Sequence, residues 1–256
     1  MIRERGVHSL NADILYGLPL QNQVRIADSV QKLLALSPDR VALYGYAHVP
    51  WMSKRQQMIP SDAMPTPEER LDLFEVARQL FLADGYDEIG IDHFARPSDG
   101  MAKAARAGTL RRNFQGYTDD TAPVLIGLGA SSISRFPQGY AQNASGTADH
   151  TRAIRAGQFS THRGHVFSGE DKLRGRIIEA LMSDFHVSRA EILRDYEVSA
   201  DALAKMFTDA AAAFPDMVIV DDAGLTIPPH AKPLTRMIAR MFDAYDHGKA
   251  KHSAAV

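Results

Sequence analysis

Apolar residues in the first part of the chain follow two periods, one typical of strands and the other of helices. The segment VHSLNADILYGLP predicts a buried strand, since Leu10, Ile14 and Leu15 are apolar and a glycine and a proline end it. In the next segment, QVRIADSVQKLLAL, one helical face collects Val24, Ala27, Val30 and Leu34. DRVALYGYAHVP then predicts a second strand. A strand, a helix and a strand in succession indicate the parallel sheet of an α/β protein.

A second helix and two more strands are predicted farther along. Thr66, Pro67 and Glu69 have the spacing of a helix start, with a capping threonine, a proline at the first helical position and a glutamate three residues after the cap. The helix ends at Gly85. Its inward-facing residues are Leu73, Ala77, Leu80 and Phe81. DEIGIDHFARP predicts a third strand and PVLIGLGASSIS a fourth.

After about residue 168 the pattern becomes helical. Ser188 and Ser199 each precede a run with helical spacing, and MVIVDDAGLTIPP predicts a short hairpin before a last helix. Three helices, a hairpin and a helix outline a winged-helix-like module. We therefore expect a first domain over residues 1–168 and a second over residues 169–256, whose polar tail HGKAKHSAAV is expected to fray.

The composition argues against several classes of protein. A net charge of −2 over 256 residues gives no general case for nucleic-acid binding, and the acidic first helices of the C-terminal module argue against DNA. No apolar run reaches the ~20 residues that span a bilayer, and no signal peptide is recognisable. We expect a cytoplasmic protein. The sequence has no cysteine, which excludes disulfides and any iron–sulfur cluster held by cysteines of this chain alone.

Four polar or turn clusters follow the predicted strands, where ligands gather in parallel α/β sheets. They are Asp13 with the turn after it, YAHVP, DHFARP and GLGASS. Each has a structural alternative: Asp13 could cap the next helix, and His48 and His93 could be satisfied histidines of the interior. GLGASS lacks the third glycine of a phosphate-binding loop. His162 and His165 have metal-ligand spacing but no third ligand, so we expect no metal site.

Arginines are concentrated from the end of the third predicted strand to the start of the fourth. They are Arg96, Arg106, Arg111 and Arg112. Guanidinium groups bind carboxylates and phosphates through two parallel hydrogen bonds, so this segment could hold an anionic ligand. For Arg106 a solvated charged surface is the simpler interpretation.

Five strings in this order, DILYGLP, YAHVP, DHFARP, RNFQGYT and GLGASSIS, resemble oxygen-independent coproporphyrinogen III oxidase, a radical S-adenosylmethionine enzyme of haem biosynthesis. RNFQGYT is the most specific of them. The resemblance covers nearly the whole chain. It implies an α/β fold, namely the C-terminal part of a radical S-adenosylmethionine partial (β/α) barrel followed by a helical winged-helix-like module.

The resemblance also implies a reaction, in which two propionates of coproporphyrinogen III are oxidatively decarboxylated to give protoporphyrinogen IX. A [4Fe-4S] cluster and two S-adenosylmethionine molecules serve this family. By motif position Asp13 would contact the cofactor at the cluster, Ala47 and Ile133 would line the second cofactor site, and Phe114 would pack nearby. Arg112 and Arg111 are the candidates for the substrate carboxylates. Catalytic residues are not assigned.

The chain departs from the family in one respect, because it has no counterpart of the C-x-x-x-C-x-x-C cluster loop. We therefore expect a C-terminal portion that is inactive alone. The alternative is a porphyrin- or haem-binding protein of the same family without turnover. The expected partners are a tetrapyrrole and either the missing N-terminal portion or a second copy of the chain paired through an open sheet edge, with no nucleic acid.

Overall fold

The computed structural model describes residues 2–51 and 53–245. The polar tail that was expected to fray lies outside these residues. The chain divides into two compact units, one formed by Met1–Asp119 with Ile177–Val256 and the other by Asp120–Arg176. The predicted boundary between residues 168 and 169 follows a different line, close to the start of α5 (Asp171–Asp184), and it stays a prediction.

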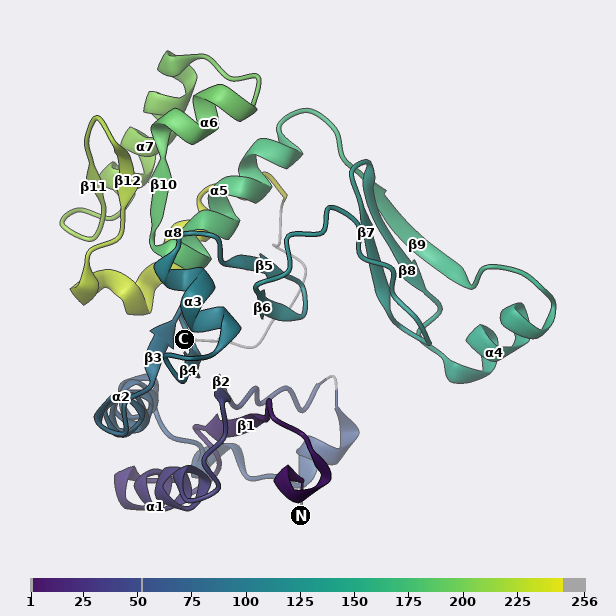
Figure 1. Cartoon of the computed structure of the whole chain (residues 1–256), viewed down its shortest axis with the longest axis vertical. Helices are drawn as coiled ribbons and strands as arrows, with labels where there is room; N and C mark the ends of the chain where they lie inside the picture. The colour runs from purple at the N-terminus through teal and green to yellow at the C-terminus, as the bar shows by residue number, and fades with distance from the viewer. Residues whose placement is uncertain (1, 52, 246–256) are drawn as a thin grey trace. The chain divides into compact units, whose positions relative to one another are not determined.

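A four-stranded mixed sheet forms the centre of the first unit, in the order β1-β2-β4-β3 (Figure 1). β1 (Asn11–Tyr16) pairs in parallel with β2 (Arg40–Gly45), as predicted. The segment predicted as a third strand forms instead an antiparallel hairpin of β3 (Asp87–Ile89) and β4 (His93–Ala95). Gly90, with φ of 57°, turns the chain between these two strands.

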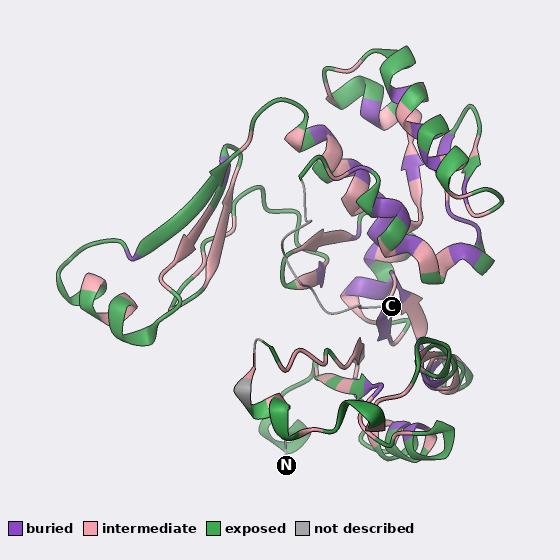
Figure 2. Ribbon diagram, turned by 180° about the vertical axis from the view of Figure 1, so that it is seen from behind, coloured by how far each residue is buried: buried purple, intermediate pink, exposed green. Residues whose placement is uncertain are grey.

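Two helices cover one face of this sheet. α1 (Gln23–Leu34) begins at Asn22, whose side chain accepts a hydrogen bond from the backbone N–H of Arg25. α2 (Pro67–Ala83) has the predicted capping box of Thr66 and Glu69. The predicted inward position of Val24 is wrong, since it is 77% exposed and Ile26 takes the buried place. The core between helices and sheet contains Tyr16, Ile26, Val30, Val41, Leu43, Leu73, Ala77, Phe81 and Phe94 (Figure 2).

Short elements follow the sheet. α3 (Gly100–Arg106) is capped by Asp99 and packs its alanines and Met101 against Ile89 and Tyr117. RNFQGYT lies in an antiparallel hairpin of β5 (Arg111–Asn113) and β6 (Gly116–Thr118). Three 3-10 helices, η1 (Arg3–Arg5), η2 (Lys54–Met58) and η3 (Ser61–Ala63), complete the N-terminal half.

The C-terminal part has the predicted helices and hairpin. After α5 come β10 (His186–Ser188), α6 (Arg189–Asp195) and α7 (Ala200–Ala213), the last two capped by Ser188 and Ser199. β11 (Ile219–Val220) and β12 (Gly224–Thr226) form the hairpin, and β10 pairs with β12 to give a three-stranded sheet. η4 (Pro229–Leu234) and α8 (Thr235–Arg240) follow.

The second unit is an antiparallel sheet of β7 (Ile133–Phe136), β8 (Gly139–Asn143) and β9 (Thr161–Val166), with α4 (Thr147–Arg155) between the last two strands. The predicted fourth strand is wrong for most of its length, because only Ile133 and the residue after it are in β7. Before β7 the segment is a loop with an isolated bridge between Leu125 and Arg135.

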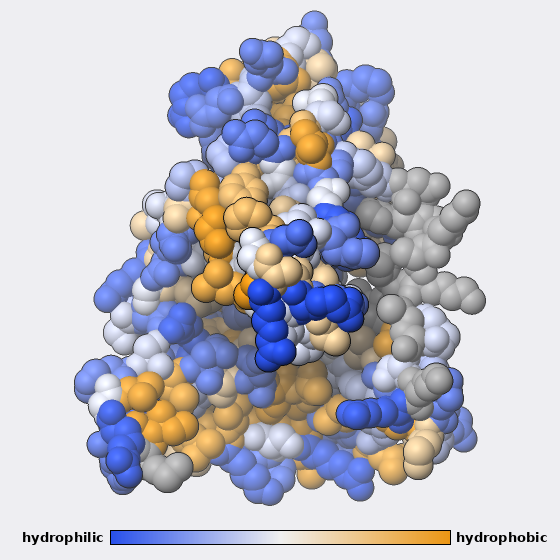
Figure 3. Space-filling model, turned by 90° about the vertical axis from the view of Figure 1, so that its right-hand side faces the viewer, coloured by the Kyte–Doolittle hydropathy of each residue, from blue (hydrophilic) through white to orange (hydrophobic). Residues whose placement is uncertain are grey.

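Apolar side chains reach the surface at many points, and they are visible as orange atoms among blue ones in Figure 3. Leu128, Phe159 and Val166 are 87%, 95% and 76% exposed in the second unit. Among the described residues, no helix has the length and apolar character that crossing a bilayer requires.

Candidate functional site

The two faces of the four-stranded sheet differ in character. Ile14 and Tyr16 of β1 pack on the core under α1 and α2, so alternation directs Asp13 and Leu15 to the opposite face. Cross-strand pairing joins Asp13 to Ala42 and Ala42 to His93, which therefore share that face. We call it the site face. Leu15 is 41% exposed there, so the strand that was predicted to be buried is open on this face.

Tyr44 of β2 lies on the site face among charged groups. Burial raises the pKa of its hydroxyl above the ordinary value, and the carboxylates of Asp13 and Asp92 raise it further, whereas Arg112 lowers it. These three groups therefore act on Tyr44 from three different segments of the chain. The structure thus brings two of the predicted site residues, Asp13 and Arg112, within electrostatic reach of one tyrosine.

The β5–β6 hairpin lies against the site face through Tyr117. The Tyr117 hydroxyl donates to the carbonyl oxygen of Met182 at 2.8 Å and accepts from the backbone N–H of Ile91 at 3.0 Å. Its ring packs so closely on Gly90 that any Cβ at that position would collide with it. The His93 ring meets Tyr117 edge to face at 4.9 Å and Tyr44 at 5.7 Å between centroids. The hairpin is therefore fixed to the sheet by buried contacts.

Arg111 and Arg112 lie on opposite faces of the hairpin, because neighbouring residues of a strand alternate. Arg112 faces its cross-strand partner Tyr117, with the guanidinium carbon 5.4 Å from the ring centroid. The Nε of Arg112 is buried without a hydrogen-bond partner. No carboxylate of the described residues forms an ion pair with its guanidinium. The Arg112 guanidinium is therefore positioned by the Tyr117 ring and has no anionic partner within the described residues.

The loop after β2, which contains Ala47, is fixed at the rim of the sheet. The Gln56 side chain accepts from the N–H of Val49 at 2.6 Å and donates to the carbonyl of Ala47 at 3.1 Å. Arg70 of α2 donates to the carbonyl of Tyr46 at 2.9 Å. Ala47 itself is exposed. The YAHVP cluster is thus a preformed loop rather than a flexible connection.

The other predicted cofactor residues are placed as follows. Phe114 lies between β5 and β6 and is 41% exposed. Ile133 begins β7 in the second unit, and its role stays a prediction. In the GLGASS loop, a Cβ at Gly127 would come 2.6 Å from the carbonyl oxygen of Ile133, and Asn143 donates to the carbonyl of Gly129 at 3.0 Å. Gly127 therefore lets the loop pack closely on its own backbone.

Two of the arginines have structural partners away from the site face. Arg96 follows β4 at the far end of the sheet, pairs with Asp84 at 2.7 Å and lies 3.9 Å above the Tyr86 ring. Arg106 forms an ion pair with Asp87 and its side chain is 52% exposed, in agreement with the solvated charged surface expected for it. In DHFARP only Asp92 and His93 lie at the rim, because β4 is antiparallel to β2. His162 and His165 both lie in β9, where His165 pairs with Tyr140 and the register is irregular between Thr161 and Arg163.

Three residues of the site were not found from the sequence. Tyr117 belongs to the string RNFQGYT and Tyr44 to the predicted strand DRVALYGYAHVP, but neither residue carries a pattern of its own. Arg236 of α8 donates to Asp92 at 2.7 Å across 144 positions of sequence. No local signal could have predicted that contact, because it depends on how the C-terminal part packs on the sheet.

Comparison with known proteins adds the family. No protein-family model matches the chain. It is 68% identical over 256 residues to the oxygen-independent coproporphyrinogen III oxidase of Paracoccus denitrificans, covering 100% of this chain and 57% of that protein. Against the enzyme of Escherichia coli K12 it is 34% identical over 251 residues, covering 97% and 55%. The chain belongs to the oxygen-independent coproporphyrinogen III oxidase family.

A solved structure supports the same assignment. The chain matches coproporphyrinogen III oxidase (HemN) from Escherichia coli, described as a radical SAM enzyme, with a TM-score of 0.88 and 33% identity over 95% of this chain and 57% of that one. The α/β fold expected from the resemblance is thereby confirmed. The chain spans about half the length of the curated relatives it matches, in agreement with the predicted C-terminal portion.

The residues of the chain do not fit every cofactor of this family. A [4Fe-4S] cluster is held by cysteine thiolates, and the sequence has no cysteine. Among the described residues, no group of three His, Asp or Glu side chains could hold a metal ion either. No step that involves the cluster therefore belongs to these residues.

Proposed function

We propose that the chain is the carboxylate-binding, C-terminal portion of an oxygen-independent coproporphyrinogen III oxidase. The complete enzyme would convert coproporphyrinogen III to protoporphyrinogen IX by oxidative decarboxylation of two propionates. In this proposal the β5–β6 hairpin holds a propionate of the tetrapyrrole over the site face. Radical generation belongs to a part of the enzyme that carries the cluster.

One observation carries this proposal, namely the state of Arg112. Its guanidinium rests on the Tyr117 ring without a carboxylate from the described residues, and its Nε is buried and unpaired. A buried donor without a partner costs about 1–3 kcal/mol. A ligand carboxylate would remove that cost through charge-assisted hydrogen bonds. The substrate has four carboxylates, so a propionate is the matching group.

The cofactor role rests on Asp13, Ala47 and Phe114, with Ile133 as a fourth predicted contact. Asp13 is exposed on the site face, and its one hydrogen bond within the described residues comes from Asn11 at 2.8 Å. Asn22 caps α1, so Asp13 is not needed for that purpose. In the complete enzyme S-adenosylmethionine would supply the radical chemistry, at a cluster held outside this chain. Asp13 would accept hydrogen bonds from hydroxyl or amino groups of that cofactor, and the family would bind two such molecules.

A titration of the chain with coproporphyrin III, the stable oxidised form of the substrate, tests the proposal by absorbance. The tetramethyl ester of the same porphyrin is the matched control, because it keeps the ring and loses the four charges. We expect saturable binding of the acid and much weaker binding of the ester. Equal binding of both, or of neither, would contradict a carboxylate site.

The alternative, a porphyrin- or haem-binding protein without turnover, predicts the same titration. The two readings separate in a complete relative whose matching segment is exchanged for this chain. The oxidase proposal predicts that the hybrid decarboxylates coproporphyrinogen III anaerobically, whereas the chain alone does not cleave S-adenosylmethionine under dithionite. Binding without turnover in a folded, cluster-loaded hybrid would favour the alternative.

A further inference from the structure

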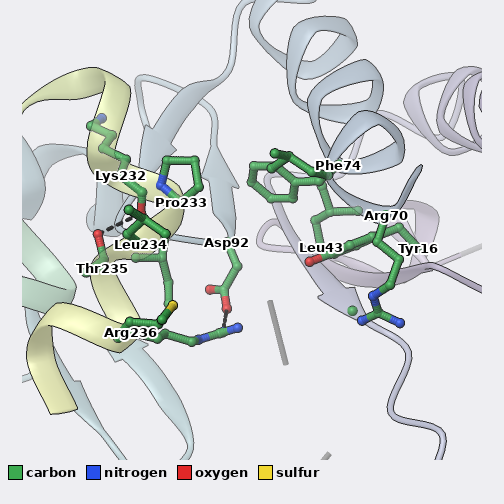
Figure 4. A pocket seen from close by; sticks show the side chains of 14 residues that line it. Tyr16, Leu43, Arg70, Phe74, Asp92, Lys232, Pro233, Leu234, Thr235 and Arg236 are labelled. Carbon is green, nitrogen blue, oxygen red and sulfur yellow. Dashed lines mark hydrogen bonds and ion pairs between the residues drawn. The ribbon is translucent and has the colours of Figure 1, made fainter. Parts of the chain in front are cut away.

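Asp92 connects the C-terminal segment of the chain to the site face. Its Oδ2 accepts from Arg236 of α8 at 2.7 Å (Figure 4). Its Oδ1 lies 2.7 Å from Nδ1 of His93. The carboxylate is buried, with its side chain 10% exposed. Both oxygens of a buried carboxylate are therefore engaged, one by a fixed cation and the other by an imidazole.

The second nitrogen of His93 has no such partner. Nδ1 faces Asp92, and no hydrogen bond joins Nε2 to the described residues. Nε2 lies next to the β5–β6 turn, since a Cβ placed on Gly116 would be 3.8 Å from it. The ring is held between Tyr44 and Tyr117 by two edge contacts. His93 thus presents one free nitrogen beneath the hairpin that carries Arg112.

Charge balance decides what that nitrogen can do. A carboxylate at Nδ1 selects the neutral form in which Nδ1 carries the proton and Nε2 is an acceptor. A buried carboxylate without a counter-charge would favour protonation of the imidazole, which turns Nε2 into a donor. Arg236 supplies the counter-charge to Asp92 from outside the site face. A positive charge on the imidazole of His93 is then not required to balance the carboxylate.

We propose that Arg236 is a positioning residue that acts through Asp92 to keep His93 neutral, with the Nε2 lone pair available as a hydrogen-bond acceptor at the site face. The ligand group that it would meet is an N–H or O–H donor, such as a pyrrole N–H or a sugar hydroxyl. The identity of that ligand rests on the proposed function. The protonation state of His93 does not.

The same segment offers a matched control. Lys232 of η4 forms an ion pair with Glu88 of β3 at 3.3 Å, so it also ties the C-terminal segment to the sheet. Glu88 has a second cation in Arg78 at 2.9 Å, and it makes no contact with His93 among the described pairs. Loss of Lys232 therefore loosens the same attachment without changing the charge on Asp92.

Imidazole ¹⁵N NMR of the whole 256-residue chain tests the proposal at pH 7.5, with the His93 signals identified by their absence in His93→Gln. We expect neutral His93 with protonated Nδ1 in the wild type, in Arg236→Lys and in Lys232→Met. In Arg236→Met both ring nitrogens of His93 should give the ¹⁵N chemical shifts of protonated nitrogens. Circular dichroism establishes that each variant is folded.

Two results would overturn the proposal. One is an Arg236→Met spectrum in which His93 keeps its wild-type state, which would make Arg236 a purely structural residue. The other is an equal change in Lys232→Met, which would assign the effect to a loosened segment. The measurement uses no ligand, so a failed porphyrin titration would count against the proposed function and leave this result standing.

Discussion

Arg112 and Tyr117 face each other across the β5–β6 hairpin, with the guanidinium carbon 5.4 Å from the centroid of the phenol ring. The Tyr117 hydroxyl is in turn fixed by Met182 and Ile91. The guanidinium is therefore oriented by a residue that is itself immobilised. Such support is what a recognition site for a carboxylate requires, because less side-chain entropy is lost when the ligand binds.

We expect Arg112→Ala to weaken binding of coproporphyrin III to the chain, measured by absorbance titration. Loss of a hydrogen bond to a charged group costs about 1.5–3 kcal/mol, which corresponds to about 10- to 100-fold in dissociation constant. Arg111→Ala is the control, since its side chain lies on the other face of the same strand. An equal loss in both variants would show that the hairpin contributes only net positive charge.

For Asp13 we expect a loss of cofactor binding with unchanged stability. In a complete relative that carries this segment, Asp13→Ala should weaken S-adenosylmethionine binding, measured by calorimetry, because an exposed hydrogen-bond acceptor is removed from the site face. Its melting temperature should stay close to that of the parent.

For Asn22→Ala we expect the opposite result, a loss of stability with unchanged cofactor binding. Asn22 caps α1, and loss of such a cap costs about 1 kcal/mol of unfolding free energy. The variant should melt earlier and bind the cofactor normally. If Asp13→Ala lowered the melting temperature as much as Asn22→Ala does, the carboxylate would have a structural role instead.

Tyr117→Phe should destabilise the chain at neutral pH. The substitution leaves the N–H of Ile91 and the carbonyl of Met182 without a partner in a buried place. The expected cost is about 1–3 kcal/mol in the free energy of unfolding, measured by urea denaturation. A cost near zero would mean that water replaces the hydroxyl, and the hairpin would then be less firmly held than its contacts indicate.

The free energies of unfolding of the wild type and of Tyr117→Phe should converge at high pH. Burial raises the pKa of Tyr117 to about 12 in the folded chain, whereas an unfolded tyrosine titrates near 10. The phenol is protonated in both states below about pH 10, so its contribution is complete there, and it is lost as the pH rises toward 12. The stability difference between wild type and Tyr117→Phe should therefore shrink between about pH 10 and 12. A constant difference over that range would contradict a buried, protonated Tyr117.

Local signals in the sequence predicted those elements that depend on neighbours along the chain. The capping box of Thr66 and Glu69 and the caps at Ser188 and Ser199 are present as expected, since each satisfies a helix N-terminus within three residues. DEIGIDHFARP was misassigned because Gly90 breaks one apolar run into a hairpin. The apolar residues of this segment do not indicate by themselves where a turn divides it into two strands.

The site was predictable only in part, for a similar reason. The family strings identified Asp13 and the hairpin arginines, but not which of Arg111 and Arg112 faces the sheet. That depends on the pairing of Arg112 with Tyr117, which a strand pattern does not specify to one residue. Arg236 was missed altogether, because its partner Asp92 is distant in sequence and Arg236 itself lies in a segment without a motif.

The free edge of β1 leads to a last prediction, on self-association. In the described sheet β1 pairs with β2 alone and forms one edge of the order β1-β2-β4-β3. Such an edge exposes unpaired N–H and C=O groups, and Leu15 beside it is 41% exposed. We expect the chain to be oligomeric by light scattering at tens of micromolar, and Leu15→Lys to reduce its apparent mass, because a charge in an edge strand opposes pairing with another strand. Val24→Lys, at a 77% exposed position of α1, makes the same change away from the edge and should have little effect. A monomeric wild type would show that β1 does not template association. An equal reduction in both variants would show that general surface hydrophobicity, and not the edge of β1, controls the association.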